Sequence, residues 1–425
     1  MNTKSNTTQY KNGRLFMENV DLAAVAEKVG TPAYVYSAGQ LEANFNAYRH
    51  ALSSVMSEKD FTLCYACKAN SNLAVLSLLK NLGAGADIVS GGELARAIAA
   101  GVKPGKIVYS GVGKSEEELT EAIRRNIFQI NVESEPELEL ISKIAVKLKK
   151  QVTVSIRVNP NVDAKTHAKI TTGKKENKFG IDIKKAPALY ARAKKLKNIH
   201  AAGVAVHIGS QLTSLAPFRR AYVRVAELVK TLRRQGHDIS RVDLGGGLGI
   251  TYKDETPPDL YLYALMIRDV ITPLGVHIVL EPGRSIVGDA GVLLSRVVNI
   301  KHGDAKKFLI LDAAMNDLMR PSLYDAYHAV LPHREKGKKA VYDVVGPVCE
   351  TGDTFLTNET LTELKAGDLV AIMTAGAYGA VMSSNYNTRP LAAEVMVKGK
   401  SFELVRKPQT VQDLVKNDRI PAWLK

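Results

Sequence analysis

The chain has 425 residues, 45% of them hydrophobic and 24% charged, a balance typical of a folded globular protein with room for two domains. Its apolar runs fall short of the roughly 20 residues that cross a bilayer, and its N-terminal stretch is too polar for a secretory signal. Three cysteines are too few for a disulfide framework. We therefore expect a cytoplasmic protein without a membrane partner. The net charge of +15 would suit a nucleic-acid-binding protein, but the basic doublets are scattered and no aromatic residues interleave with them, so we expect solvated surface charge and no nucleic-acid partner.

Short apolar segments alternate with longer amphipathic segments from about residue 60 to residue 282. This alternation predicts parallel strands joined by helices, and eight strands are the number that closes a barrel. An open doubly wound sheet fits the alternation less well. We therefore predict an α/β fold, a (β/α)8 TIM barrel. The expected strands are 61–66, 86–90, 106–110, 127–132, 152–158, 201–209, 241–246 and 276–281.

Helices are expected over 72–82, 90–101 and 115–126. The last of these begins with Ser115 and Glu118, which have the spacing of a capping box, and Ser134 with Glu137 has the same spacing. Side chains alternate along a strand, which places His207 and Glu281 at the last inward-facing positions of their strands. Polar residues at such positions are what a barrel active site requires.

After Arg284 the pattern changes to short strands separated by turns, which predicts a separate β-rich domain, sandwich-like or barrel-like. The strand-like "PAYVYS" (32–37) is expected to join it, because chain ends often pack together. We predict a barrel domain over 37–282 and a β-rich domain over 1–36 plus 283–425. The polar stretch 159–178 is expected to form a lid or a disordered loop. The expected strands of the second domain are 292–300, 307–314, 341–346, 368–374, 392–397 and 401–407.

Lys68 is the first candidate for chemistry, because it follows the first predicted barrel strand, where such barrels place their active sites. Removal from water lowers the pKa of a lysine and makes its amine a nucleophile for carbonyl groups. A lysine that reaches out to solvent is the alternative. The nearby Cys64 and Cys67 resemble a redox or zinc motif, but residues three apart on a strand point to opposite faces, so we expect two small buried residues and no metal site.

Two glycine-containing turns follow the last two predicted barrel strands. In "DLGGGLG" (243–249) successive glycines allow backbone N–H groups to wrap an oxyanion, although a tight turn is the alternative. The spacing matches neither a dinucleotide motif nor a P-loop. "EPGR" (281–284) adds another glycine and an arginine. Because barrels of this class often bind phosphate with the loops after strands seven and eight, the two turns together predict a phosphate site.

Glu281 and His207 complete the candidate site. A carboxylate at residue 281 could hold a proton on a ring nitrogen or pair with Arg284, and His207 could stack on a flat ring, act as a base or be a hydrogen-bonded core residue. A reactive lysine, a phosphate site, a carboxylate and a histidine at one rim fit a cofactor with an aldehyde and a phosphate, which is pyridoxal 5'-phosphate (PLP).

Several motifs of the sequence resemble those of a known family. "YACKAN", "DIVSGGEL", "HIGSQ", "GGGLG", "EPGR", "DAAMNDLMRPSLY", "CETGD" and "GAYG" occur in the order and spacing of the diaminopimelate decarboxylases. That family belongs to the alanine-racemase-like PLP enzymes, which combine a barrel with a β domain. "YACKAN" and "EPGR" also occur in ornithine and arginine decarboxylases, whereas "MRPSLY" and "CETGD" point to diaminopimelate. One small departure is Cys67, where an aliphatic residue is more usual.

The resemblance implies a set of cofactor contacts. Lys68 would hold PLP as a Schiff base, His207 would stack on the ring, and Glu281 would keep the pyridine nitrogen protonated. Asp87 matches a rim residue near the lysine. The positions matching phosphate or further cofactor contacts are Ser210, Gly246, Gly247, Gly283, Arg284 and Tyr378.

The resemblance also implies the reaction, which is decarboxylation of meso-2,6-diaminopimelate to L-lysine and CO2, the last step of lysine biosynthesis. Cys349 matches the proposed proton donor, and "CETGD" would complete the active site of the other subunit of a homodimer. Ornithine or arginine decarboxylation and amino-acid racemisation remain alternatives on the same fold. The matching substrate positions are Arg284, Arg320, Tyr324, Glu350 and Tyr378.

Overall fold

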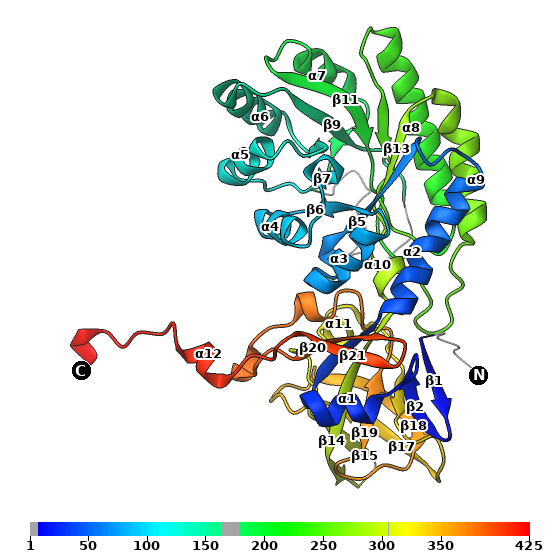
Figure 1. Cartoon of the computed structure of the whole chain (residues 1–425), viewed down its shortest axis with the longest axis vertical. Coiled ribbons are helices and arrows are strands. Elements are labelled where there is room, and N and C mark those ends of the chain that lie inside the picture. Colours follow the sequence, from blue (N-terminus) through cyan, green and yellow to red (C-terminus); the bar gives the residue numbers. More distant parts are fainter. Residues whose placement is uncertain (1–6, 164–177, 305) are drawn as a thin grey trace. The chain divides into compact units, whose positions relative to one another are not determined.

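The computed structural model describes residues 7–163, 178–304 and 306–425 (Figure 1). Most of the stretch 159–178, expected to be a lid or a disordered loop, lies outside these residues. The chain divides into two compact units, one made of Met1–Gln40 with Val287–Lys425 and the other of Leu41–Ile286. Within the described residues, no helix combines the length and the apolar character needed to cross a membrane.

The unit Leu41–Ile286 is a closed barrel of parallel strands, as predicted. Its strands follow one another around the barrel in chain order, and β13 pairs with β5 while β8 pairs with β9, which closes the ring. This closure excludes the open doubly wound sheet. The eight barrel strands are β5 (Phe61–Ala66), β6 (Gly85–Ile88), β7 (Ile107–Tyr109), β8 (Gln129–Val132), β9 (Val152–Asn159), β11 (Ile199–Ala205), β12 (Arg241–Asp243) and β13 (His277–Leu280), and the short β10 (Ile181–Asp182) pairs beside β9.

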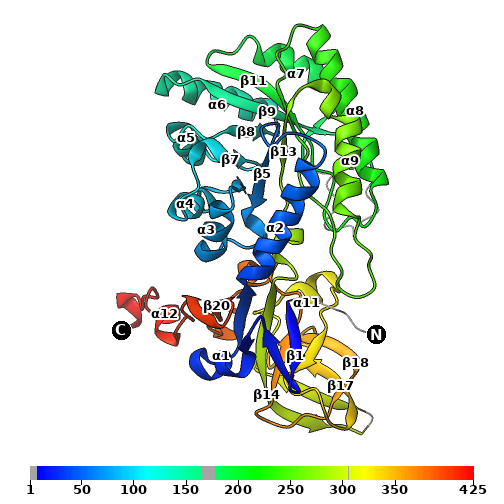
Figure 2. The ribbon, with the colours of Figure 1, turned by 45° about the vertical axis from the view of Figure 1, so that its right-hand side comes forward.

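Helices alternate with these strands and lie on the outside of the barrel (Figures 1 and 2). The interior is packed: Cys64 in β5, Val108 in β7 and Val279 in β13 form one buried cluster, as expected for a barrel whose interior is filled by side chains. The helices of this unit and its ends are α2 (Ala38–Ser53), α3 (Leu73–Asn81), α4 (Gly91–Ala99), α5 (Glu116–Arg124), α6 (Glu135–Leu148), α7 (Ala186–Ala193), α8 (Ala216–Arg234), α9 (Leu260–Val270) and the short α10 (Arg284–Val287).

The two predicted capping boxes differ in outcome. At α5, Ser115 accepts the N–H of Glu118 and the Glu118 side chain accepts the N–H of Ser115, so the box is complete. At α6, Ser134 accepts the N–H of Glu137 at 3.3 Å, but the Glu137 carboxylate binds the N–H of Glu133 and the Lys114 amine instead. The second prediction was therefore only half right, because a buried lysine competes for the glutamate.

The other unit is rich in β-structure, as predicted. One sheet has the order β18-β17-β15-β14-β4-β20-β21, with β19 pairing to β14 and to β16, so the N-terminal strand β4 lies between two C-terminal strands. The polar strand β18 was not predicted. The core of this β-rich unit contains a cluster of buried aliphatic residues that includes Leu22, Val35 and Val395. The strands are β4 (Ala33–Ser37), β14 (Gly291–His302), β15 (Lys307–Leu311), β16 (Val330–Pro332), β17 (Lys339–Val345), β18 (Thr354–Thr362), β19 (Leu369–Ile372), β20 (Ala393–Lys398) and β21 (Ser401–Arg406), with a separate small sheet of β1 (Thr8–Lys11), β2 (Arg14–Met17) and β3 (Val20–Asp21).

Short helices complete this unit: α1 (Leu22–Val29), α11 (Arg320–Tyr324) and α12 (Val411–Val415).

Candidate active site

Lys68 lies in a single 3-10 turn directly after β5, at the carboxyl end of the barrel. Its Nζ donates to Oδ2 of Asp87 at 2.7 Å, and the lysine side chain is 35% exposed whereas that of Asp87 is fully buried. Asp87 lies in the neighbouring strand β6, and its other oxygen, Oδ1, has no hydrogen-bond partner within the described residues. The lysine is therefore anchored at the barrel mouth by a buried carboxylate.

The nearby Cys64 and Cys67 are both buried and unbridged. Their sulfur atoms approach different backbone carbonyls, those of Lys106 and Tyr65 respectively. Burial raises the pKa of each thiol well above its usual value, so neither is suited to redox chemistry or metal binding. Both behave as small core residues, which agrees with the rejection of a redox motif.

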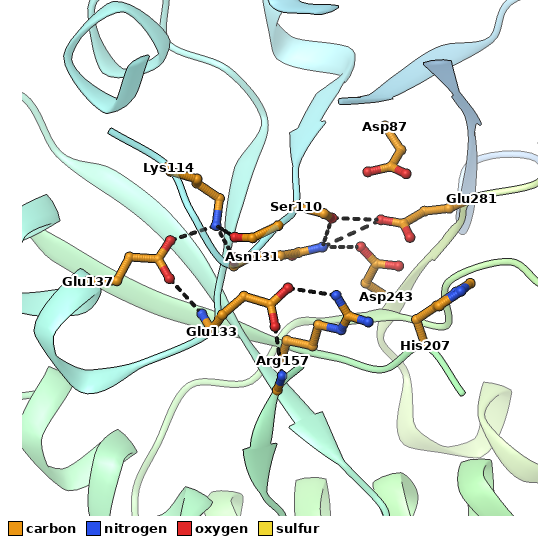
Figure 3. A network of polar contacts seen from close by, with 12 residues as sticks. Asp87, Ser110, Lys114, Asn131, Glu133, Glu137, Arg157, His207, Asp243 and Glu281 are labelled. Carbon is orange, nitrogen blue, oxygen red and sulfur yellow. Dashed lines mark hydrogen bonds and ion pairs between the residues drawn. The ribbon is translucent and has the colours of Figure 1, made fainter. Parts of the chain in front are cut away.

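Polar side chains from β8 and β12, together with Ser110 after β7, form a layer beside Glu281 (Figure 3). Asn131, in β8, donates to Asp243 at 2.9 Å, to Ser110 at 3.0 Å and to Glu281 at 3.4 Å. Gln129 also donates to Asp243, at 3.1 Å. None of these four residues was predicted: Ser110 ends a predicted strand, but Gln129, Asn131 and Asp243 lie inside predicted strands, where no local pattern distinguishes them from core residues.

Glu281 is the acid in this layer whose protonation matters most. Burial raises its pKa well above the usual value, and the neighbouring carboxylates of Asp243 and Asp87 raise it further. Asp243 accepts three hydrogen bonds, from Asn131, Gln129 and the N–H of Gly245, whereas the hydrogen bonds to Glu281 from Asn131 and Ser110 are both 3.4 Å long. Burial raises the pKa of Asp243 as well, but Asp243 accepts more and shorter hydrogen bonds than Glu281, so Asp243 is the group that ionises first and Glu281 is the group that keeps a proton in the absence of a nearby cation.

His207 follows β11 and is held by the glycine turn after β12. Its Nδ1 accepts the N–H of Gly246 at 3.2 Å. Burial lowers the pKa of His207 well below its usual value, and the positive charges of Arg157 and Lys68 lower it further. The imidazole is consequently neutral at pH 7, with its proton on Nε2, and is suited to stacking on a flat ring.

Arg157, in β9, belongs to a chain of ion pairs that runs outward from the mouth (Figure 3). Its Nη1 donates to Glu133 at 2.6 Å, and Glu133 also accepts the N–H of Gly180. Lys114, whose side chain is fully buried, donates to Glu137 at 2.6 Å, and Glu137 accepts the N–H of Glu133. These contacts hold a cation close to His207 in a fixed orientation.

A candidate anion site lies where the loops after β11, β12 and β13 meet. Arg284 donates to the Tyr252 hydroxyl at 2.7 Å and to Ser210 Oγ at 3.2 Å. A Cβ at Gly246 would collide with the carbonyl oxygen of Glu281, and one at Gly247 with that of Gly209, so only glycine allows these loops to pack together. Two hydroxyls, a guanidinium and glycine-rich backbone form a donor set that suits a phosphate group. Tyr252 was not predicted from the sequence.

These residues fit PLP. The anion site supplies phosphate donors, Glu281 supplies a proton-holding carboxyl, and Lys68 supplies an amine beside Asp87, whose Oδ1 is unpaired within the described residues. All of them come from the barrel unit Leu41–Ile286. The fit therefore rests on side chains that the barrel itself places together.

The expected substrate residues belong to the β-rich unit and are described within it. Arg320 begins α11, is buried, and donates to His328 at 2.9 Å, and Tyr324 ends the same helix. Cys349 is exposed, and Glu350 beside it accepts the Tyr386 hydroxyl at 2.8 Å.

Tyr378 adopts a left-handed backbone conformation, with a φ of 56°. An aromatic residue rarely takes up this conformation, because its Cβ crowds the backbone. Strain of this kind is concentrated at functional sites.

Comparison with known proteins identifies the family to which the chain belongs. Residues 38–288 match the family described as pyridoxal-dependent decarboxylase, pyridoxal binding domain. The chain is 50% identical to the diaminopimelate decarboxylase of Pseudomonas aeruginosa over 411 residues, 96% of this chain and 97% of that protein. It is similar to the solved structure of diaminopimelate decarboxylase from M. jannaschii in co-complex with L-lysine, with a TM-score of 0.95, 41% identity and 99% coverage of both chains. It also resembles the structure of the Helicobacter pylori diaminopimelate decarboxylase complexed with L-lysine, with a TM-score of 0.89, 43% identity, and coverage of 93% of this chain and 98% of that one.

Proposed function

The chain belongs to the diaminopimelate decarboxylases, a family of PLP-dependent decarboxylases, and from this premise we propose how its residues convert meso-diaminopimelate to L-lysine and CO2. Bound PLP supplies an aldehyde that captures an amine and a ring that withdraws electrons from the bond that breaks. We assign the cofactor site to the barrel domain (37–282, with Gly283 and Arg284 of the adjoining turn) and the substrate clamp to the β-rich domain (1–36 plus 283–425).

Lys68 would hold the cofactor through its amine. Its ion pair with Asp87 at 2.7 Å fixes the position of Nζ. Because Asp87 is fully buried, the amine is kept at one place at the mouth while the substrate amine replaces it and while L-lysine is released. This placement of Lys68 is the observation that carries the proposal.

The surrounding residues orient the cofactor and set its charge. Ser210, Arg284 and the backbone of Gly246, Gly247 and Gly283 would hold the phosphate, and Tyr252 would support Arg284. The neutral imidazole of His207 would cover one ring face. Glu281 can pass its proton to the ring nitrogen and remain beside it as a carboxylate counter-ion, which favours the electron-withdrawing form of the ring.

The substrate carries an amine and a carboxylate at both ends. Arg320 would clamp the carboxylate that is retained in L-lysine, and Glu350 would pair with the amine beside it. Ornithine lacks that far carboxylate and would leave a buried arginine without its anion, which disfavours its binding. Arg284, Tyr324 and Tyr378 complete the proposed contacts.

Loss of CO2 leaves an electron pair on the α-carbon, which must take up a proton to give L-lysine. We assign this proton to the Cys349 thiol. Its exposure in the chain described here is consistent with a role at a surface that a second subunit covers.

We also propose that the protein is a homodimer in which the "CETGD" segment (349–353) of one subunit completes the site of the other. An interface of this kind is isologous, so both sites form at once. The cytoplasm is the proposed location, because a reducing compartment keeps the three unbridged cysteines as thiols.

The test is CO2 release by the purified protein with PLP, offering meso-diaminopimelate, ornithine and arginine in parallel, with Lys68→Ala as the inactive control. We expect release from diaminopimelate alone, and its loss by a factor of about 1,000 or more in the variant. Release from ornithine or arginine would retain the role of Lys68 and overturn the substrate clamp. Activity that survives in Lys68→Ala would overturn the assignment of the lysine.

A further inference from the structure

Arg320 is in hydrogen-bond contact with a buried histidine, His328, which has no role in the proposed reaction. It is 6% exposed at the start of α11, and its Nη1 lies 2.9 Å from Nε2 of His328. His328 is completely buried and follows α11 by a few residues. The two side chains belong to the same unit of the chain, so their contact is a feature of that unit alone.

The second nitrogen of His328 determines which way the contact with Arg320 points. Nδ1 lies 2.8 Å from the carbonyl oxygen of Met373. A carbonyl oxygen only accepts, so Nδ1 must carry the proton, and in the neutral ring Nε2 is then an acceptor. Arginine has donors only, so Arg320 donates to Nε2 of His328, which this tautomer leaves free to accept.

The backbone that holds the imidazole is itself fixed. Met373 directly follows β19, and its N–H donates to the carbonyl of Ala329, the residue after His328, at 2.8 Å. Two hydrogen bonds therefore join the His328 segment to the end of β19, one through the backbone and one through the imidazole. The ring plane is fixed, and so is the direction in which Nε2 accepts from Arg320.

We propose that His328 is a positioning residue for substrate selection: it fixes the Arg320 guanidinium in the orientation that clamps the far-end carboxylate of the substrate. This inference rests on the proposed role of Arg320. A bidentate contact with a carboxylate requires the guanidinium plane to have one particular orientation. An arginine side chain that is free to rotate loses rotamer entropy when binding fixes that orientation. His328 uses one of the five N–H donors and removes that freedom before the substrate arrives.

The test compares two ligands of the holoenzyme that differ only at the clamp. L-lysine keeps the far-end carboxylate, whereas 1,5-diaminopentane lacks it, and both are measured as competitive inhibitors of CO2 release. His328→Asn can still donate to the Met373 carbonyl but has no atom at the Nε2 position. His328→Gln places an amide oxygen near that position. His333→Gln is the matched control, because His333 is a buried histidine of the same unit that pairs with Asp21.

We expect His328→Asn to raise the inhibition constant of L-lysine about tenfold and to leave that of 1,5-diaminopentane within about twofold. His328→Gln should recover most of the lysine affinity, and His333→Gln should change neither constant. KM for meso-diaminopimelate should follow the lysine constant, with kcat changed less. Thermal unfolding and cofactor absorbance of each variant establish that it is folded and loaded.

Equal weakening of both inhibitors, or identical behaviour of the Asn and Gln variants, would show that His328 is merely a packing residue and would overturn the inference. Arg320→Met separates this failure from failure of the proposed function. If that variant leaves lysine inhibition unchanged, or if the wild type releases no CO2 from meso-diaminopimelate, the clamp or the activity itself is wrong and the inference falls with it. If both behave as expected, only the His328 variants decide.

Discussion

Three carboxyl groups, those of Asp87, Asp243 and Glu281, crowd the barrel mouth around a single lysine amine, and each is treated differently by its neighbours. Asp87 is paired with Lys68, and Asp243 is surrounded by amide donors. Glu281 is left with the longest hydrogen bonds and a raised pKa. A nearby cation would stabilise the ionised form of this carboxyl, and a protonated ring nitrogen is such a cation.

Replacing Glu281 by Gln tests this reading. The pKa of Glu281 is raised in the folded protein, so its contribution to stability is complete below the ordinary carboxyl pKa and is lost as the pH rises through the folded value. In the cofactor-free protein, the unfolding free energy of Glu281→Gln relative to the wild type should therefore be lowest at pH 4 and should increase as the pH rises to 8. In the holoenzyme, CO2 release should fall by about 100-fold or more, because an amide neither gives up a proton nor becomes a counter-ion. A wild type and variant with the same pH dependence of stability would contradict the raised pKa.

The residues at strand ends show how far the sequence could lead. Lys68, His207 and Glu281 could be placed at the barrel mouth because each stands at or after the end of an apolar segment whose length and alternation predict a strand. Asn131 and Asp243 sit at equivalent positions, but their meaning depends on a contact between residues more than 100 positions apart in the chain. No local pattern reports such a contact, so the polar layer around Glu281 could not be predicted.

At the scale of elements, helix starts were predicted well where the cap is local. The side chains of Ser115 and Glu118 each accept the backbone N–H of the other residue, so the spacing of these two residues is enough to predict the start of α5. Glu137 has the same spacing from Ser134, but a buried lysine from elsewhere in the barrel takes its carboxylate. Strand β18 was missed for a related reason: the sequence "TFLTNETLT" has little apolar alternation, and it is pairing with β17 that makes it a strand.

The start of α4 carries a carboxyl whose pKa can be tested. Glu93 accepts the N–H of Val89 at 2.7 Å at this helix end, but burial raises its pKa from 4.5 to about 7. The stability it contributes is complete below pH 4.5 and is lost as the pH rises through about 7. We expect Glu93→Gln to gain about 2–3 kcal/mol in unfolding free energy relative to the wild type between pH 4.5 and pH 8.

The measurement is urea unfolding of the cofactor-free protein at several pH values. Glu116→Gln provides the control, since Glu116 is an exposed carboxyl in the first turn of α5. The part of the pH dependence that Glu93→Gln shows beyond this control is assigned to the Glu93 carboxyl. A difference between Glu93→Gln and the wild type that does not change with pH would contradict the raised pKa of Glu93.

At the scale of the whole molecule, the two units divide the proposed work. Every candidate cofactor residue up to Arg284 lies in the barrel unit, and Arg320, Cys349, Glu350 and Tyr378 lie in the β-rich unit. The fold class of both units could be predicted from the spacing of apolar segments. The position of β4 between β14 and β20 could not, because it pairs residues from opposite ends of the chain.

Sharing of active sites between subunits predicts rescue by mixing. A Lys68→Ala subunit keeps an intact "CETGD" segment, and a Glu350→Ala subunit keeps an intact lysine. If the segment acts across the dimer, a mixed dimer contains one site with both residues and one site with neither. Random exchange makes half of the dimers mixed, so two inactive proteins should together regain about a quarter of wild-type CO2 release.

The control for this mixing uses two lesions within one barrel. Lys68→Ala mixed with Glu281→Gln should regain nothing, because both residues lie in the unit Leu41–Ile286 and no exchange can bring the intact copies into one site. Rescue in the first mixture and none in the second would require the segment to serve the partner's site. Absence of rescue in both, with subunit exchange demonstrated by differently tagged chains, would place Glu350 in the site of its own subunit. The proposed shared active sites would then be wrong, whereas the roles of Lys68 and Glu281 would stand, since those depend on the barrel alone.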